Sequence, residues 1–141
     1  GSAAVICAIN ALARLEVKAN VMAIVAATDN RIGDGAIVPD DIITSANGKT
    51  IEIISTDAEG RLTLADAVWF AQKEGAKRVV DVATLTGAMV MALGKEFTGA
   101  FTNNKEFYNE FKNASETTKE PLILCRFDVM IKHLLFRIDC F

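Results

Sequence analysis

Two carboxylates and one guanidinium stand at every second position of the run Asp57-Ala58-Glu59-Gly60-Arg61. On an extended segment alternate side chains share a face, so we expect Asp57, Glu59 and Arg61 to point into one pocket. The small residues between them let the backbone approach a ligand closely. Adjacent carboxylates repel each other, and one or two divalent cations are the usual compensating charge, which leaves the arginine to bind an anion. The run therefore predicts a metal and anion site.

The alternative is a solvated turn, which is the commoner fate of charged residues around a glycine. The neighbouring sequence favours the site instead. Residues 50–54 alternate in the manner of a β-strand, and apolar residues at helical spacing follow the run: Leu62, Leu64, Ala67, Val68 and Ala71. A junction between strand and helix lies at the carboxyl edge of a sheet, where α/β proteins bind their ligands.

The composition indicates one globular domain and excludes several function classes. The chain has 141 residues, of which 51% are hydrophobic, enough to bury a core. A net charge of -3 without any Lys/Arg cluster argues against nucleic acid as a partner. No uncharged stretch reaches the roughly 20 residues of a membrane span, and no secretory leader is visible, so we expect a cytoplasmic protein with no membrane partner. Three widely spaced cysteines are expected to be buried free thiols: Cys7, Cys125 and Cys140.

The apolar spacing alternates between helical and strand patterns, which predicts the α/β class. The expected helices are 3–15, 62–73, 88–93 and 105–117, and the expected strands are 21–26, 50–54, 78–83 and 98–102. We expect the first helix to cover strand 21–26. The helix at 62–73 is expected to end at Gly75 and to connect the strands on either side of it in a right-handed βαβ crossover. Residues 28–47 are expected to form a long loop, and residues 48–50 a hairpin turn rather than the end of a phosphate-binding loop.

The charged run also resembles the signature of a known family, the M17 leucyl aminopeptidases. Ser55-Thr56-Asp57-Ala58-Glu59-Gly60-Arg61-Leu62 differs at one position from the family string Asn-Thr-Asp-Ala-Glu-Gly-Arg-Leu. A second motif, Asp81-Val82-Ala83-Thr84-Leu85-Thr86-Gly87-Ala88, stands at the family's spacing, and the resemblance extends from Gly1 to about Pro121. It implies part of a catalytic domain built as a three-layer sandwich, with a mostly parallel or mixed sheet covered by helices.

The resemblance implies a peptidase that removes the N-terminal residue of peptides with two divalent ions, zinc, manganese or magnesium. The counterparts of Asp57 and Glu59 bind these ions, which polarise the scissile carbonyl and activate a water. The counterpart of Arg61 holds a bicarbonate ion that acts as general base. The family works as a homohexamer.

The resemblance also assigns a substrate pocket to the second motif. The counterparts of Thr84, Leu85 and Gly87 line it, although a plain turn between strand and helix is the alternative for this segment. Met89 and Met91 are further candidates for lining the pocket, but filling a core is the commoner role of methionine.

The chain departs from the family pattern in three places. Ser55 replaces an Asn whose carbonyl contacts metal or substrate in the family: a backbone contact would survive this change, whereas a side-chain contact would be altered and with it metal affinity or selectivity. The family's other metal ligands and its catalytic Lys correspond to positions before Gly1, so we expect this chain to be inactive by itself. Residues 122–141 leave the pattern and are interpreted as a tail of non-family sequence, from a shifted reading frame or a truncated gene model, after a partial catalytic domain at 1–121.

Two alternatives stay open at this point. Within the tail, an amphipathic helix is the alternative to non-family sequence, with one apolar face formed by Ile131, Leu134, Leu135 and Ile138. For the whole chain, the alternative to a fragment of an aminopeptidase is a non-catalytic α/β scaffold that associates through apolar surfaces.

Overall fold

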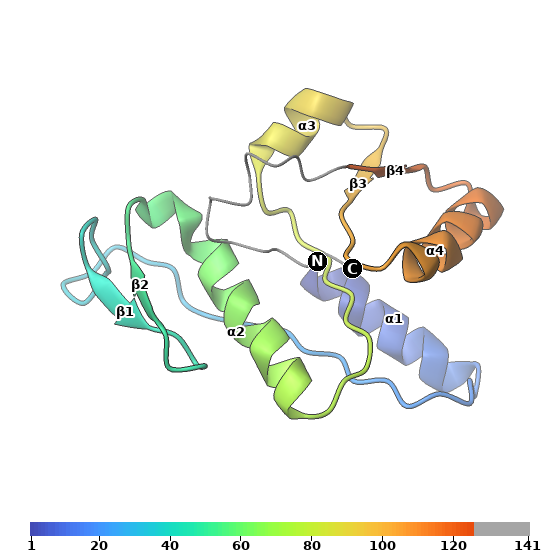
Figure 1. Cartoon of the computed structure of the whole chain (residues 1–141), viewed down its shortest axis with the longest axis horizontal. Helices are drawn as coiled ribbons and strands as arrows, with labels where there is room; N and C mark the ends of the chain where they lie inside the picture. Colours follow the sequence, from blue (N-terminus) through green and yellow to red (C-terminus); the bar gives the residue numbers. More distant parts are fainter. Residues whose placement is uncertain (126–141) are drawn as a thin grey trace. The chain divides into compact units, whose positions relative to one another are not determined.

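The computed structural model describes residues 1–125. The chain divides into two compact units, Gly1–Val79 and Val80–Phe141, each treated by itself below. Figure 1 shows the helices and the short strands of both units. Most of the predicted tail, including its expected apolar helical face, lies outside the described residues. No helix in the described part is long and apolar enough to cross a membrane.

The first unit begins with helix α1, Ser2–Arg14, as its apolar spacing predicts. Arg14 lies in the last turn, where a cation interacts favourably with the helix dipole. Cys7 on this helix is exposed, so its predicted burial is wrong. None of the residues of α1 is buried.

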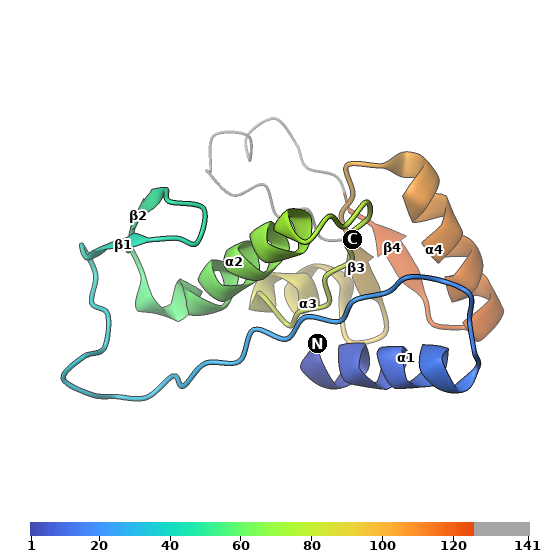
Figure 2. The ribbon, with the colours of Figure 1, turned by 90° about the horizontal axis from the view of Figure 1, so that it is seen from below.

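The predicted strand at 21–26 does not form. Between α1 and the first strand the chain runs without helix or strand, as Figure 2 shows. An apolar run becomes a strand only when a neighbouring strand takes up its backbone hydrogen bonds, and the described residues offer none there. Val21 and Met22 consequently stay half exposed, at 51% and 50%. Because this strand is absent, the predicted packing of α1 on it is absent too.

A β-hairpin occupies the region predicted as a long loop and the strand after it. Strands β1, Ile42–Thr44, and β2, Thr50–Glu52, pair antiparallel with Ile43 opposite Ile51. The turn between them places Gly48 at φ 83°, a conformation that glycine adopts without strain. Asn47 Oδ1 accepts hydrogen bonds from Ser45 Oγ and the Lys49 amide at 2.7 and 3.0 Å. The predicted hairpin turn is therefore confirmed at Gly48 and Lys49, whereas Thr50 is the first residue of β2.

Helix α2, Glu59–Lys73, follows a short 3₁₀ turn, η1, at Thr56–Ala58. It ends as predicted at Gly75, which has φ 86°. The Gly75 amide donates to Gln72 O and the Ala76 amide to Ala71 O, both at 3.0 Å. This pair of bonds is a Schellman motif, which satisfies the last carbonyls of the helix.

The second unit contains a parallel strand pair. Strands β3, Thr98–Ala100, and β4, Leu122–Leu124, align with Gly99 opposite Ile123. Helix α4, Lys105–Thr118, lies between them in sequence and makes the crossover that parallel strands need. Asn104 caps α4 by accepting the Phe107 amide at 2.9 Å.

The predicted strand at 78–83 is absent, for the same reason as at 21–26. The crossover expected after α2 therefore does not form, and the βαβ arrangement of the described residues is β3-α4-β4. In the described part of the chain the sheets are two-stranded, one antiparallel and one parallel.

Helix α3, Gly87–Leu93, packs against β3 at Gly99. A Cβ on Gly99 would overlap Met89 Sδ and Cε and approach Leu93 Cδ1 to 3.2 Å. Met89 is half-buried at this contact, whereas Met91 is 90% exposed. Within the described residues the buried apolar side chains are few: Ile53, Ala71, Ala100 and Tyr108.

Candidate metal and anion site

The run that carries the predicted site is helical, which corrects the expectation of an extended segment. Ser55, at φ -143° and ψ 127°, is the last extended residue; Asp57 lies in η1, and Glu59 is the first residue of α2. Successive helical residues turn by about 100°, so strand alternation does not place Asp57, Glu59 and Arg61 on one face. Apolar spacing predicts that the helix starts at Leu62, but it starts at Glu59. The helix dipole stabilises an acidic side chain in the first turn, which favours the earlier start.

The three charged side chains differ in exposure. Asp57 is exposed, whereas Glu59 and Arg61 are half-buried. The Nε of Arg61 is buried and has no hydrogen-bond partner among the described residues. A buried donor without a partner is costly, and guanidinium nitrogens suit the planar fork of a carboxylate-like anion. This orphaned donor is the structural feature that fits a bound anion.

The two carboxylates fit only part of a metal site. Asp57 and Glu59 supply hard oxygen donors two positions apart in sequence. Among residues 1–125, no group of three or more His, Cys, Asp or Glu side chains gathers at a distance suited to one ion. Zinc sites in proteins have three or four protein ligands, so residues 1–125 do not by themselves form a site of that kind.

The predicted pocket residues belong to the second unit. Thr84 and Leu85 lie in the segment without helix or strand that precedes α3, the former exposed and the latter half-buried. Thr86 is the N-cap residue, and Gly87 is the first residue of α3. A Cβ on Gly87 would meet nothing within 4 Å, so open space lies beside this position.

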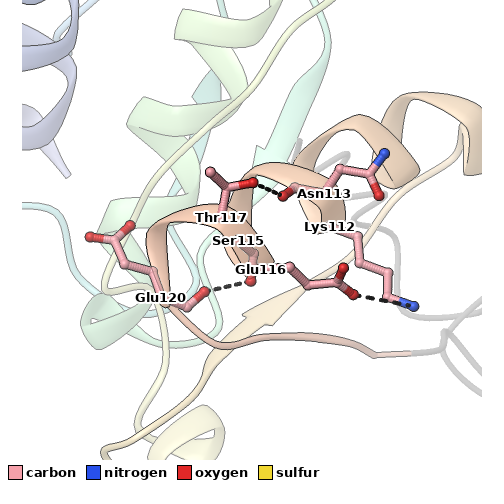
Figure 3. A network of polar contacts seen from close by, with 6 residues as sticks. All are labelled: Lys112, Asn113, Ser115, Glu116, Thr117 and Glu120. Carbon is pink, nitrogen blue, oxygen red and sulfur yellow. Dashed lines mark hydrogen bonds and ion pairs between the residues drawn. The ribbon is translucent and has the colours of Figure 1, made fainter.

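A described cavity lies elsewhere in the second unit, at the C-terminal end of α4. It has a volume of about 340 Å³ and is lined by Lys112, Ser115, Glu116, Lys119, Pro121 and Leu122. Figure 3 shows the polar contacts there: Ser115 Oγ donates to Glu120 O at 2.5 Å, and Lys112 pairs with Glu116 at 3.9 Å. None of the predicted site residues lines it.

Comparison with known proteins decides the family. The sequence model described as "Cytosol aminopeptidase family, catalytic domain" matches residues 1–134. The chain belongs to the cytosol aminopeptidase family. It is 55% identical over 123 residues to a probable cytosol aminopeptidase of Clostridium tetani, covering 86% of this chain and 26% of that protein. A probable cytosol aminopeptidase of Bacillus subtilis is 49% identical over 122 residues, covering 86% of this chain and 24% of that protein.

The backbone is also similar to that of a solved leucine aminopeptidase. A solved mutant of tomato leucine aminopeptidase matches with a TM-score of 0.73 and 41% sequence identity, covering 80% of this chain and 23% of that one. The α/β class and the resemblance to M17 peptidases are thereby confirmed. The chain spans about a quarter of the length of these relatives.

Sequence reasoning missed one contact of the helix that carries Glu59 and Arg61. Asp66 on α2 accepts a hydrogen bond from the backbone amide of Ala46 at 2.9 Å. The sequence does not predict this bond, because an aspartate within a helical pattern is usually interpreted as a solvated side chain. Its partner also lies 20 residues away in the sequence.

Proposed function

We propose that this chain is the metal- and anion-binding part of the catalytic domain of a leucyl aminopeptidase, which hydrolyses the N-terminal residue of peptides. Membership of the family supports the reaction class. The observation that carries the proposal is the Nε of Arg61, two residues after Glu59, which is buried and has no hydrogen-bond partner among residues 1–125. A buried charged donor without a protein partner is expected where a bound ligand accepts its hydrogen bond.

Asp57 and Glu59 are the proposed ligands for two divalent ions, zinc, manganese or magnesium. When bound, such a pair polarises the scissile carbonyl and lowers the pKa of a water. The protein's part is to hold the carboxylates in place: Glu59 is fixed by the first turn of α2, and Asp57 by the 3₁₀ turn that precedes it. Ser55, which stands where the family string has Asn, ends the extended segment and lies outside both turns.

Arg61 is proposed to hold a bicarbonate ion. Its half-buried guanidinium lies in the first turn of α2, where the helix dipole adds to its positive charge. Both features favour an anion, and the planar fork matches a planar oxyanion in two hydrogen bonds. Arg61 would hold such an ion in place, and the ion would supply a general base for the attacking water.

Thr84, Leu85 and Gly87 are proposed to bind the peptide substrate. The backbone of Thr84 and Leu85 lies outside regular structure, so their carbonyl and amide groups are available for a peptide. The open space beside Gly87 leaves room for the substrate backbone. We further propose that the whole enzyme is cytoplasmic, in line with the names of its relatives, and that it assembles as the homohexamer that the resemblance to the family implies.

A chimera tests the proposed function. Residues 1–121 would replace the matching segment of the Clostridium tetani relative, and hydrolysis of a leucyl chromogenic amide would be measured with Mn²⁺. We expect turnover that is lost in Asp57→Ala and Glu59→Ala and kept in Asp34→Ala, which removes the same charge from an exposed loop. A folded chimera without turnover would favour the second candidate, a non-catalytic scaffold.

The chain by itself is expected to show no turnover, because two carboxylates do not complete a metal site. The same assay on the isolated chain checks this. Turnover that disappears in Asp57→Ala would show that the described donors suffice.

A further inference from the structure

An Asn-Gly pair stands in the turn that joins β1 to β2, the hairpin labelled in Figure 1. Asn47 and Gly48 are both exposed, and none of residues 44–50 is buried. A Cβ on Gly48 would meet nothing within 4 Å, so open space lies beside its backbone. The peptide group that joins the pair is therefore accessible to water and to base from the solvent.

An asparagine followed by glycine can lose its side-chain amide without an enzyme. The glycine nitrogen gives up its proton to base and attacks Cγ of the asparagine. The new Cγ–N bond closes an imide ring while the Cγ–Nδ2 bond breaks, and the leaving nitrogen takes up a proton and departs as ammonia. Water then opens one of the two C–N bonds of the ring, which gives aspartate or isoaspartate. Glycine favours the attack because it has no Cβ to crowd its nitrogen.

In the folded turn both reacting groups are held by hydrogen bonds. The Gly48 amide donates to Ser45 O at 2.9 Å, which opposes the loss of its proton. Asn47 Oδ1 accepts from the Lys49 amide at 3.0 Å and from Ser45 Oγ at 2.7 Å, which opposes rotation of the side chain toward the glycine nitrogen. The ring therefore closes from an open form of the turn, in which these bonds are broken.

The turn is also a segment that opens readily. Besides the bonds of the pair itself, it is closed by the Ser45 amide, which donates to Lys49 O, and by the Ala46 amide, which donates to Asp66 on α2, both at 2.9 Å. Exposed hydrogen bonds without buried apolar contacts characterise the regions of a protein that open locally at low free energy. The reactive form is thus reached without unfolding of the whole unit.

We propose that Asn47 is a site of spontaneous deamidation, gated by opening of the hairpin turn. The proposal is independent of the proposed function. The product adds a negative charge one residue from the Ala46 amide, which already binds the carboxylate of Asp66. Because like charges repel, the modified turn is held less firmly to α2. Isoaspartate also lengthens the backbone of the turn, since its chain continues through the former side-chain carbon.

Peptide mapping by mass spectrometry tests the site, from the mass gained when an amide NH₂ is exchanged for OH. In urea, at mildly alkaline pH, Asn47 should deamidate faster than Asn30, an exposed asparagine that Arg31 follows. In the folded chain the same product should form at Asn47 about tenfold or more slowly, because the bonds of the turn must first break. Asn47 no faster than Asn30 in urea, or no product in the folded chain, would overturn the site. Equal rates in both conditions would overturn the gate.

Ser45→Ala tests the gate in the folded chain. The variant loses the hydroxyl bond to Asn47 Oδ1 and keeps the backbone bonds of the turn, so deamidation should be about threefold to tenfold faster. Ser115→Ala is the matched control, since it removes a hydroxyl that bonds Glu120 O in the second unit. Circular dichroism checks that both variants fold. An unchanged rate in Ser45→Ala would overturn the gate, and a slower one would show that the hydroxyl assists the attack by polarising the carbonyl.

Asn47→Gln checks that the product arises at this position. Its side chain carries the same amide on a longer stem, which closes a larger ring far more slowly, so deamidation of the turn peptide should disappear. Deamidation of that peptide at the parent rate would overturn the assignment to Asn47.

Discussion

At the scale of single residues, Arg61 has the most informative environment. Its half-buried guanidinium has a donor that the described residues leave without a partner. The assignment of Asp57, Glu59 and Arg61 to a site stays a prediction from the sequence, made because these residue types suit metal and anion chemistry. The sequence did not predict their conformation, since alternation in a five-residue string does not distinguish an extended segment from a helix start.

Arg61→Lys in the chimera should weaken bicarbonate binding by about tenfold to a hundredfold, because one charged hydrogen bond and the planar fork are lost. The activity should be partly restored as the bicarbonate concentration is raised. Arg31→Lys is the control, since Arg31 is 82% exposed and pairs only loosely with Asp29 at 3.7 Å. Activity that does not depend on bicarbonate in either protein would contradict the assignment.

Gly99→Ala should destabilise the chain by about 1 kcal/mol, because the new methyl group overlaps the end of the Met89 side chain. Urea unfolding measures the change. The cost should shrink when Met89→Ala is already present, which assigns it to that contact. Gly35→Ala, where a Cβ meets nothing within 4 Å, is the control.

At the scale of the elements, the sequence predicted local structure well and sheets poorly. Helices α1 and α2, the Schellman motif at Gly75 and the hairpin turn depend on neighbours in sequence, so spacing and glycine position suffice. The runs 21–26 and 78–83 have the composition of buried strands, yet a strand needs a partner that no local pattern specifies. The pairing of β3 with β4 is of this second kind.

Asn104→Ala should destabilise α4 by about 1 kcal/mol, because the Phe107 amide loses its capping acceptor. Thermal unfolding followed by circular dichroism measures it. Asn103→Ala makes the same change one position earlier, outside the cap position, and should have little effect. Equal losses in the two variants would contradict a capping role.

At the scale of the whole chain, much apolar surface is open. Ile32 is 105% exposed, Ile54 83% and Leu15 74%. Soluble monomers rarely expose many large apolar groups, which mark surfaces for association. This exposure agrees with a chain that spans about a quarter of its relatives' length.

The isolated chain should therefore self-associate as its concentration rises. Sedimentation velocity over a wide concentration range would show a growing share of larger species, and added sulfate should increase it because that salt strengthens apolar burial. A single species of monomer mass at every concentration would contradict this expectation.

The two strand pairs also differ in how soon they can assemble. The partners in the hairpin are separated by a short turn, and such structures close in about 1–10 μs. The parallel pair must wait until the chain from Phe101 to Pro121 has folded back through α4, and such distant pairings are slow. Pulsed isotope labelling during refolding should thus protect Ile51 before Ile123, so the segment leading to Asp57 takes shape while the second unit is still unpaired.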